Sequence, residues 1–325
     1  MKSRLVVILA VALALAAVVV AGSKLIKFAG TTAPVAHAGL PADFAAYLGV
    51  FETGVPPGFG PVTQFAQVAG RQPNLVGYYS GWPEPFNTSW ADMLRSHRAT
   101  PFVQIDPTDA SVAALANGTY DLYLRSYADS VRAFGHAVVL GFGHEMNAPW
   151  YSWGYGHVSP ATFVAAWRHL VTLFHQQGAD NVTWLWTLQA DEPGKTGPIE
   201  SWWPGSQYVT WVGIDGYYYT SSDTFSSVFG TTITQVRKFT GKPVLLSEAA
   251  VAPAAGQFVK IPDLFRGMNR DRTLGVVWFD VDQHGPSNGG PSRQDWRIED
   301  SRYAKGAFKL GVEENLTPFP LPASS

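Results

Sequence analysis

Short apolar runs recur along the chain from about Tyr47 onward, each followed by a loop rich in glycine, proline and aromatic residues and then by a helical stretch. The runs are continuously apolar rather than alternating, which is typical of parallel strands buried on both faces. Their centres lie roughly 26 to 45 positions apart, which leaves room for a crossover helix between successive strands. The eight predicted strands are Tyr47–Phe51, Leu75–Tyr79, Pro101–Ile105, Ala137–Phe142, Val182–Trp186, Thr210–Asp215, Val244–Leu246 and Val276–Phe279.

Three of the intervening segments carry clear helix signals. Residues 121–134 place leucine, tyrosine, alanine and valine at helical spacing. A helix over 162–177 is expected to be capped by Ser159, to have Pro160 in its first turn and to end at Gly178. A further helix is predicted over 89–98, with Ser89 as its cap.

Eight strands alternating with helices over about 280 residues predict an α/β fold, a (β/α)8 TIM barrel. A doubly wound open sheet is the alternative. That alternative is weakened because no glycine-rich dinucleotide-binding loop follows an early strand.

The N-terminus predicts export. Lys2 and Arg4 precede residues 5–22, an uncharged apolar run of 18 residues. This pattern is typical of a secretory signal or an N-terminal membrane anchor. We therefore expect a secreted or extracellular protein, either released or held at the membrane by residues 5–22. The predicted organisation is a signal or anchor over 1–22, a stalk over 23–43, a catalytic barrel over 44–312 and a flexible tail over 313–325.

Composition narrows the chemistry. The net charge of −2 gives no electrostatic basis for binding nucleic acid, and a membrane contact is expected only through the N-terminal segment. The absence of cysteine from the 325 residues excludes disulfides, cysteine–zinc sites and thiol nucleophiles. Aromatic residues make up 14% of the chain, which fits either a well-filled core or a carbohydrate cleft. We expect a monomer that needs no cofactor and no catalytic metal.

Two glutamates follow predicted strands. Glu145 comes after the fourth strand and Glu248 comes 103 residues later, after the seventh. In a barrel, side chains at the carboxyl ends of the strands meet at one mouth. Glycoside cleavage with retention needs two carboxyl groups about 5–5.5 Å apart, one as acid/base and the other as nucleophile. A negative neighbour at that distance opposes a second ionisation by roughly 3 kcal/mol, which keeps one carboxyl protonated near neutral pH.

Several motifs carry a resemblance to a known family. The run His144-Glu145-Met146-Asn147, followed by a tryptophan-rich loop, resembles glycoside hydrolase family 26, the β-mannanase family within the large clan of retaining barrels. Further similar segments occur between Leu48 and Asp282. They are Trp202-Trp203-Pro204-Gly205, Trp211 to Tyr217, Leu246-Ser247-Glu248 and Trp278-Phe279.

The resemblance implies roles for individual residues. Glu145 is expected to be the acid/base, Glu248 the nucleophile and Tyr217 a hydrogen-bond donor to Glu248. The other expected contacts are with substrate: His144 in the subsite of the sugar under attack, Trp150 and Trp153 at the border of the cleft, Trp278 as a floor for that sugar, Trp82 on the non-reducing side and Asp106 at sugar hydroxyls. The third strand lacks the aromatic residue that the family pattern places before its carboxylate, and this departure argues against mannan as the substrate.

The sequence therefore predicts a retaining endo-β-glycosidase that acts on a polysaccharide by double displacement, with β-1,4-mannan as first choice. Mixed-linkage β-glucan, xylan or an exopolysaccharide is the alternative substrate, and an inactive carbohydrate-binding barrel is the alternative class. A zinc protease is excluded because Ala148 stands where the second histidine of such a motif must be. A serine hydrolase is excluded because the chain has no Gly-x-Ser-x-Gly elbow.

Overall fold

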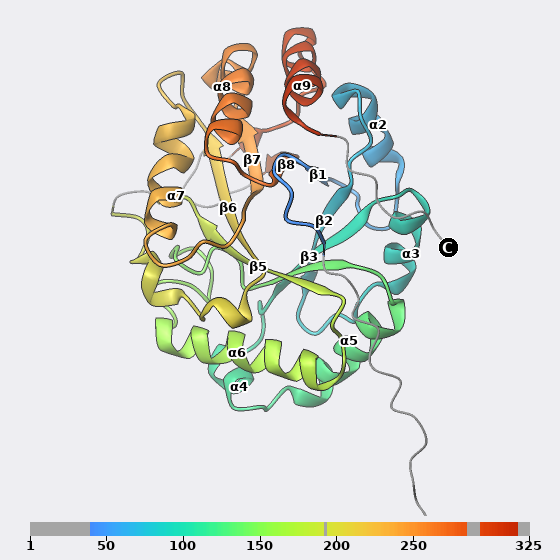
Figure 1. Cartoon of the computed structure of the whole chain (residues 1–325), viewed down its shortest axis with the longest axis vertical. Coiled ribbons are helices and arrows are strands. Elements are labelled where there is room, and N and C mark those ends of the chain that lie inside the picture. Colours follow the sequence, from blue (N-terminus) through green and yellow to red (C-terminus); the bar gives the residue numbers. More distant parts are fainter. Residues whose placement is uncertain (1–39, 192–193, 285–292, 318–325) are drawn as a thin grey trace, which may run out of the picture. The chain divides into compact units, whose positions relative to one another are not determined.

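The described part of the chain forms a closed barrel of eight parallel strands. The computed structural model describes residues 40–191, 194–284 and 293–317, all of which belong to a compact unit, His37–Ser325. Each strand pairs with the next one in the chain, and the last strand closes on the first (Figure 1). The predicted TIM barrel is thus confirmed. The strands are β1 (Tyr47–Glu52), β2 (Leu75–Gly81), β3 (Thr100–Asp106), β4 (Val138–Phe142), β5 (Val182–Gln189), β6 (Trp211–Tyr218), β7 (Val244–Val251) and β8 (Gly275–Asp280).

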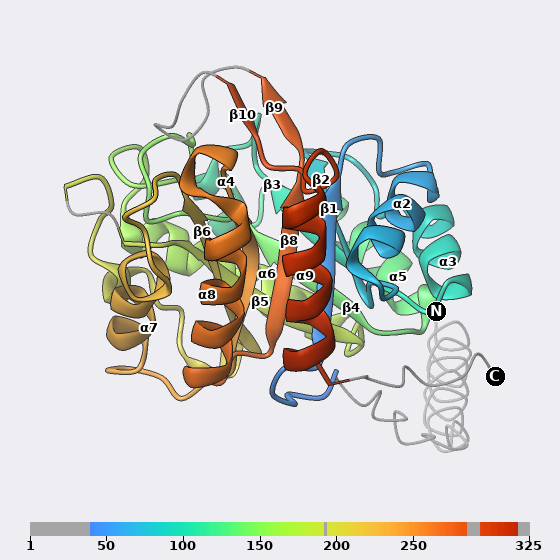
Figure 2. The same ribbon diagram turned by 90° about the horizontal axis from the view of Figure 1, so that it is seen from above.

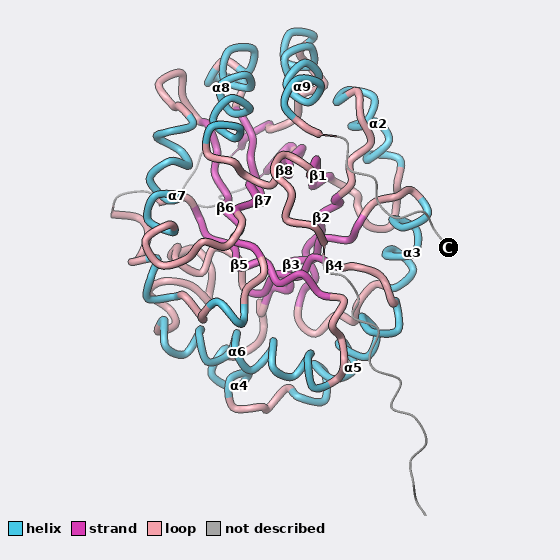
Figure 3. The backbone as a smooth tube through the Cα atoms, viewed as in Figure 1, coloured by secondary structure: helices cyan, strands magenta, loops and turns pink. Residues whose placement is uncertain are grey.

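Helices surround this barrel as an outer layer, seen as the cyan ring around the magenta strands (Figure 3). The principal helices are α2 (Gly60–Ala69), α3 (Thr88–Ser96), α4 (Val112–Ala116), α5 (Asp121–Phe134), α6 (Pro160–Gln176), α7 (Thr231–Val236), α8 (Gln257–Arg270) and α9 (Arg302–Asn315). Single-turn helices are η2 (Ile199–Trp202), η3 (Ser206–Tyr208), η4 (Ser226–Gly230) and η5 (Pro253–Ala255). A short antiparallel pair, β9 (Asp282–His284) and β10 (Arg293–Asp295), projects beyond the end of β8 (Figure 2).

Local sequence signals explain where the helices begin. The Ser159 hydroxyl accepts a hydrogen bond from the amide of Thr162 at 3.1 Å, and Pro160 opens α6 as predicted. The prediction for α3 was wrong by two residues at its cap. The side chain of Asn87, rather than Ser89, accepts the amide hydrogen bond of Trp90 at 3.0 Å.

Most of the tryptophan side chains are buried in the hydrophobic core. Six of them are among the largest fully buried side chains, which favours the packing explanation of the aromatic content over the cleft explanation at those positions. Their large apolar surfaces fill the interior of the barrel domain. These residues are Trp167, Trp186, Trp202, Trp211, Trp278 and Trp296.

The chain ends differ in part from the prediction. The flexible tail predicted from residue 313 is wrong for its first residues, because α9 continues to Asn315 and Leu316 is buried. The amide of Thr317 also bonds to the carbonyl of Ala45 at 2.9 Å, which ties the end of α9 to the start of the barrel. The predicted signal or anchor over 1–22, and the stalk up to residue 39, lie outside the described residues. Among the residues that are described, no helix is long and apolar enough to cross a membrane.

Candidate active site

The turn after β4 holds Glu145 in an unusual backbone conformation. Gly143 has φ +53° and Glu145 has φ +54°, a left-handed geometry that costs energy for any residue other than glycine. The turn is fixed from β5: the Glu145 amide donates to the carbonyl of Thr187 at 3.0 Å. Asn147 adds two hydrogen bonds of 2.9 Å to the main chain of Gln189. The strained turn thus points a fully buried carboxyl group in a fixed direction.

Glu248 lies within β7, because this strand continues to Val251 rather than ending at Leu246. The hydroxyl of Tyr217 on β6 donates a hydrogen bond to Oε2 of Glu248, so the expected contact is present. The hydroxyl of Tyr79, at the carboxyl end of β2, donates to Oε1 of the same side chain. Each oxygen of Glu248 therefore accepts a hydrogen bond from a different strand, which fixes the plane of the carboxylate.

Three carboxyl groups meet at the mouth of the barrel. Oxygens of Glu145, Asp215 and Glu248 all lie within 4.8 Å of one another. This proximity matches the spacing of retaining glycosidases, about 5–5.5 Å, and not the 6.5–9.5 Å that leaves room for a water molecule in inverting enzymes. The structure thus brings the two predicted glutamates together across one opening.

The surroundings of these carboxyl groups raise their pKa values. Burial, opposed by His144 and reinforced by Glu248, raises the pKa of Glu145 to about 8. Burial followed by the charges of Glu248 and Glu145 raises the pKa of Asp215 well above its usual range. Burial also raises the pKa of Glu248, but His144 and the two tyrosine hydroxyls favour its charged form. Glu248 is therefore the member of the group best suited to carry the negative charge, with Glu145 protonated.

His144 is held as a cation beside the two glutamates. Its Nδ1 lies 2.8 Å from an oxygen of Asp106, and its Nε2 lies 3.2 Å from the hydroxyl of Tyr151. Burial lowers the pKa of His144, but the charge and the hydrogen bond of Asp106, together with the charges of Glu145 and Glu248, raise it to about 9. Asp106 is consequently occupied in positioning His144, which is a different role from the predicted contact with sugar hydroxyls.

The two predicted tryptophans near this turn, Trp150 and Trp153, behave differently. Trp150 is half-buried, and its indole Nε1 donates to Oε2 of Glu145 at 2.6 Å. Trp153 does not border a cleft as predicted, because it is only 3% exposed. Its ring stacks on Tyr151 at 4.4 Å, and its indole Nε1 donates to the carbonyl of His144 at 2.8 Å. It therefore supports the turn from beneath.

Trp82 also lies mostly below the surface. It is 8% exposed and packs edge-on against Tyr120 and Tyr123, with ring centroids 5.2 and 4.5 Å away. The prediction that it extends the cleft is wrong, because only 8% of its surface is exposed.

The predicted floor at Trp278 is wrong, because this side chain faces away from the mouth. Trp278 is 0% exposed and packs against Phe308 of α9, on the outside of the barrel. Successive side chains of a strand point to opposite faces, so the next residue, Phe279, points inward instead. Its ring lies 5.8 Å from that of Tyr217, at the mouth.

Sequence reasoning missed Tyr79 and Asp215. Both stand near the carboxyl ends of predicted strands, which is the signal that led to the two glutamates. A tyrosine and an aspartate in such places are common for structural reasons, and only the closure of the barrel shows that both lie beside Glu248. Trp296, which packs on Tyr217 at 4.7 Å, comes from the segment after β8 and had no signal in the sequence.

A second group of acidic side chains lies at the ends of β1 and β8. Oxygens of Glu52, Asp280 and Glu299 lie within 4.8 Å of one another, a spacing that would also suit a metal ion. Burial, followed by these neighbouring carboxyls, raises the pKa of Asp280 to about 10, and burial raises that of Glu52 to about 8. The raised pKa values of Asp280 and Glu52 favour their neutral forms. The cluster lies on the outer face of the barrel, the same face as Trp278.

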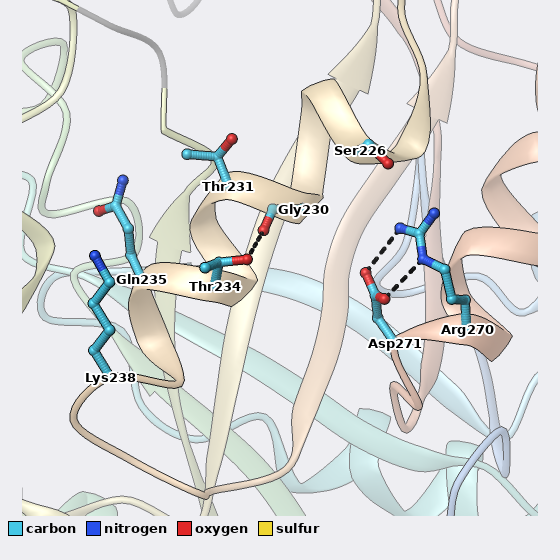
Figure 4. A pocket seen from close by; sticks show the side chains of 8 residues that line it. All are labelled: Ser226, Gly230, Thr231, Thr234, Gln235, Lys238, Arg270 and Asp271. Carbon is cyan, nitrogen blue, oxygen red and sulfur yellow. Dashed lines mark hydrogen bonds and ion pairs between the residues drawn. The ribbon is translucent and has the colours of Figure 1, made fainter.

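An open depression of about 500 Å³ lies elsewhere, between the helical segment of η4 and α7 and the end of α8 (Figure 4). Thr231, Gln235 and Lys238 line one side, and Arg270 and Asp271 line the other. The guanidinium of Arg270 is already paired with Asp271 at 2.9 Å. No catalytic constellation forms here, so the mouth of the barrel is the candidate active site.

Paired buried carboxyl groups at the mouth of a (β/α)8 barrel define the site of a glycoside hydrolase. Residues 124–288, just over half of the chain, match the model of glycosyl hydrolase family 26. The chain belongs to that family, as its motifs predicted.

Curated relatives carry several substrate names. Endoglucanase H of Acetivibrio thermocellus is 26% identical over 275 residues, covering 80% of this chain and 29% of that protein. A β-1,3-xylanase of a Vibrio species is 25% identical over 180 residues, covering 53% of this chain and 37% of that protein. A mannan endo-1,4-β-mannosidase of Caldalkalibacillus mannanilyticus is 27% identical over 97 residues, covering 28% of this chain and 18% of that protein. The chain thus spans less than two fifths of the length of each.

Solved structures share the fold. An endo-β-1,4-mannanase of Cellulomonas fimi superposes with a TM-score of 0.64 at 15% identity, covering 85% of this chain and 72% of the other. A mannanase of Bacillus subtilis superposes with a TM-score of 0.60 at 17% identity, covering 87% of this chain and 92% of the other. At these identities the likeness concerns the barrel alone.

Proposed function

We propose that this protein is a retaining endo-β-glycosidase that hydrolyses a β-linked polysaccharide, with Glu145 as acid/base and Glu248 as nucleophile. The observation that carries the proposal is the meeting of the two buried carboxyl groups within 4.8 Å at the mouth of the barrel. Membership of glycosyl hydrolase family 26 supports it independently.

The reaction follows from the protonation states. Glu248, ionised and held by two phenol hydroxyls, attacks the anomeric carbon. Glu145, whose pKa is raised to about 8 by burial, gives its proton to the departing glycosidic oxygen. The resulting ester between Glu248 and the sugar is cleaved by water, from which Glu145, now a base, takes a proton. Two displacements at the same carbon return the original anomeric configuration.

The first substrate to test is β-1,4-mannan, which the family motifs favour. A β-glucan is the second candidate, because the similarity to an endoglucanase runs over 80% of this chain. The chain covers only 29% of that protein, so the name does not by itself assign the substrate to the matching segment. β-1,3-Xylan belongs in the same panel on the strength of the Vibrio relative.

The test is release of reducing ends from mannan, mixed-linkage β-glucan, β-1,3-xylan and β-1,4-xylan. We expect release from one of them by the wild-type protein and at least a thousandfold loss in both Glu145→Ala and Glu248→Ala. Proton NMR of the first product should show the β anomer, whereas an α anomer would contradict the assignment of the two carboxyl groups.

An inactive sugar-binding barrel gives a different outcome. Such a protein would bind a polysaccharide in affinity electrophoresis without releasing reducing ends from any member of the panel. Export through residues 5–22 stays a prediction. If the segment anchors the protein, an exopolysaccharide of the producing cell joins the list of substrates.

A further inference from the structure

We propose that Tyr79 has two tasks in this active site: its hydroxyl positions the nucleophilic carboxylate of Glu248, and its ring forms the surface on which the sugar under attack lies. The inference rests on the proposed function and gives Tyr79 the platform role that sequence similarity assigned to Trp278. Each task depends on a separate feature of the side chain, so each can be removed alone.

The hydroxyl is placed to act on the charge of Glu248. It donates to Oε1, while the hydroxyl of Tyr217 donates to Oε2. Burial around the hydroxyl, at the inner end of the side chain, and the charge of Glu248 raise the pKa of Tyr79 well above its usual range, so the phenol remains a donor at every working pH. A carboxylate oxygen offers about two lone pairs, and one hydrogen bond therefore leaves room for attack on the anomeric carbon.

The two tyrosines differ in their access to substrate. Tyr217 is covered by Trp296, whose ring centroid lies 4.7 Å away, and it is buried. The ring of Tyr79 is 40% exposed although its hydroxyl reaches Glu248. A partly exposed phenol whose hydroxyl touches the nucleophile offers a surface on which a sugar ring can lie while its anomeric carbon meets the carboxylate.

The ring of Tyr79 is also held rigidly. Phe51 stacks beneath it with a centroid distance of 4.9 Å and an interplanar angle of 19°. His144 lies 5.3 Å away and limits movement on another side. A supported ring loses little conformational freedom when substrate binds, which favours its use as a platform.

Two substitutions separate the tasks. Tyr79→Phe keeps the ring and removes the donor. We expect the acidic limb of kcat/KM against pH to move upward by about one unit, because a lost hydrogen bond to a charged group raises the pKa of Glu248. KM should change by less than about threefold. Tyr79→Leu removes both features, and KM should in addition rise about tenfold, the effect of losing an aromatic contact.

The matched control is Tyr303→Phe, since Tyr303 is 57% exposed on α9 and its hydroxyl accepts a hydrogen bond from the guanidinium of Arg302. It should leave both readouts unchanged. A Tyr79→Phe profile that falls equally at every pH would overturn the positioning role, and an unchanged KM in Tyr79→Leu would overturn the platform role.

Failure of the proposed function is recognised separately. If the wild-type protein releases no reducing ends, the proposed hydrolase activity is contradicted. Both roles of Tyr79 can still be measured by methods that do not require hydrolysis. The pKa of Glu248 is followed by carbon-13 NMR in the wild type and in Tyr79→Phe, and should rise in the variant. Affinity electrophoresis on the polysaccharide that the wild type binds should show weaker retardation of Tyr79→Leu. An unmoved pKa or equal retardation would refute the corresponding role.

Discussion

Replacing Trp150 by phenylalanine tests how the acid/base is controlled. The indole Nε1 of Trp150 donates to Oε2 of Glu145 at 2.6 Å, while Oε1 is buried without a hydrogen-bond partner. The hydrogen bond from the Trp150 indole therefore stabilises the ionised form of the Glu145 carboxyl group. The substitution keeps an aromatic ring at the position and removes this one N–H group.

The expected magnitude follows from the two charge states. A hydrogen bond to a neutral group contributes about 0.5–1.5 kcal/mol, and one to a charged group about 1.5–3 kcal/mol. The difference between the middles of these ranges, about 1.2 kcal/mol, is the extra stabilisation that Trp150 gives to the carboxylate form of Glu145. Its loss should raise the pKa of Glu145 by about one unit above the value of about 8 that burial produces. Because Glu145 becomes anionic as it protonates the leaving group, kcat should fall by up to about tenfold.

The assay is the pH dependence of kcat and kcat/KM on the polysaccharide that the wild type degrades. The basic limb should move upward in Trp150→Phe. An aryl glycoside with a good leaving group needs little proton transfer, so the loss of rate should be smaller on that substrate. Trp153→Phe is the control, since the Trp153 indole donates to the carbonyl of His144 and not to a carboxyl group. A fall in kcat with an unmoved basic limb would refute the reasoning and leave Trp150 as a packing residue.

Three further predictions concern stability. Burial raises the pKa of Asp280 from 3.8 to about 10. Between these two pH values the folded protein binds more protons than the unfolded chain, so its stability falls as the pH rises. Asp280→Asn should therefore flatten the decline in Tm between pH 5 and 9, and an equally steep decline would show that Asp280 does not cause it. Gly141→Ala would place a methyl group 1.8 Å from Oε1 of Gln104 inside the barrel. The free energy of unfolding, measured in urea, should fall by about 1–3 kcal/mol. An unchanged urea midpoint would show that the Gln104 side chain moves aside without cost. Asn147→Ala removes both hydrogen bonds to the main chain of Gln189. Tm should fall by about 5 °C, and kcat should fall with it. A lower Tm with an unchanged kcat would mean that the turn holds Glu145 in place without these two hydrogen bonds.

Local pattern was enough to predict the elements of the barrel. All eight predicted strands occur, and residues 121–134 form a helix with the predicted bounds. Pattern was less informative about where strands end. The strand β7 runs to Val251, beyond its apolar run. Its main chain pairs with the neighbouring strands, and this pairing does not depend on whether a side chain is apolar or, as at Ser247, polar.

The facing of side chains could not be predicted in the same way. Trp278 and Phe279 are adjacent large aromatic residues, and the choice of which one points into the mouth depends on the register of β8 against β1. The same limit applies to Trp153 and Trp82, which look like surface aromatics in the sequence and are covered by other rings in the fold.

The sequence by itself determined the fold class and placed two glutamates after strands that a barrel must bring together, because apolar periodicity and strand order are properties of the chain. Closure of the barrel decided everything that depends on residues far apart in the chain: the second phenol on the nucleophile, the cationic histidine and the outward-facing tryptophan.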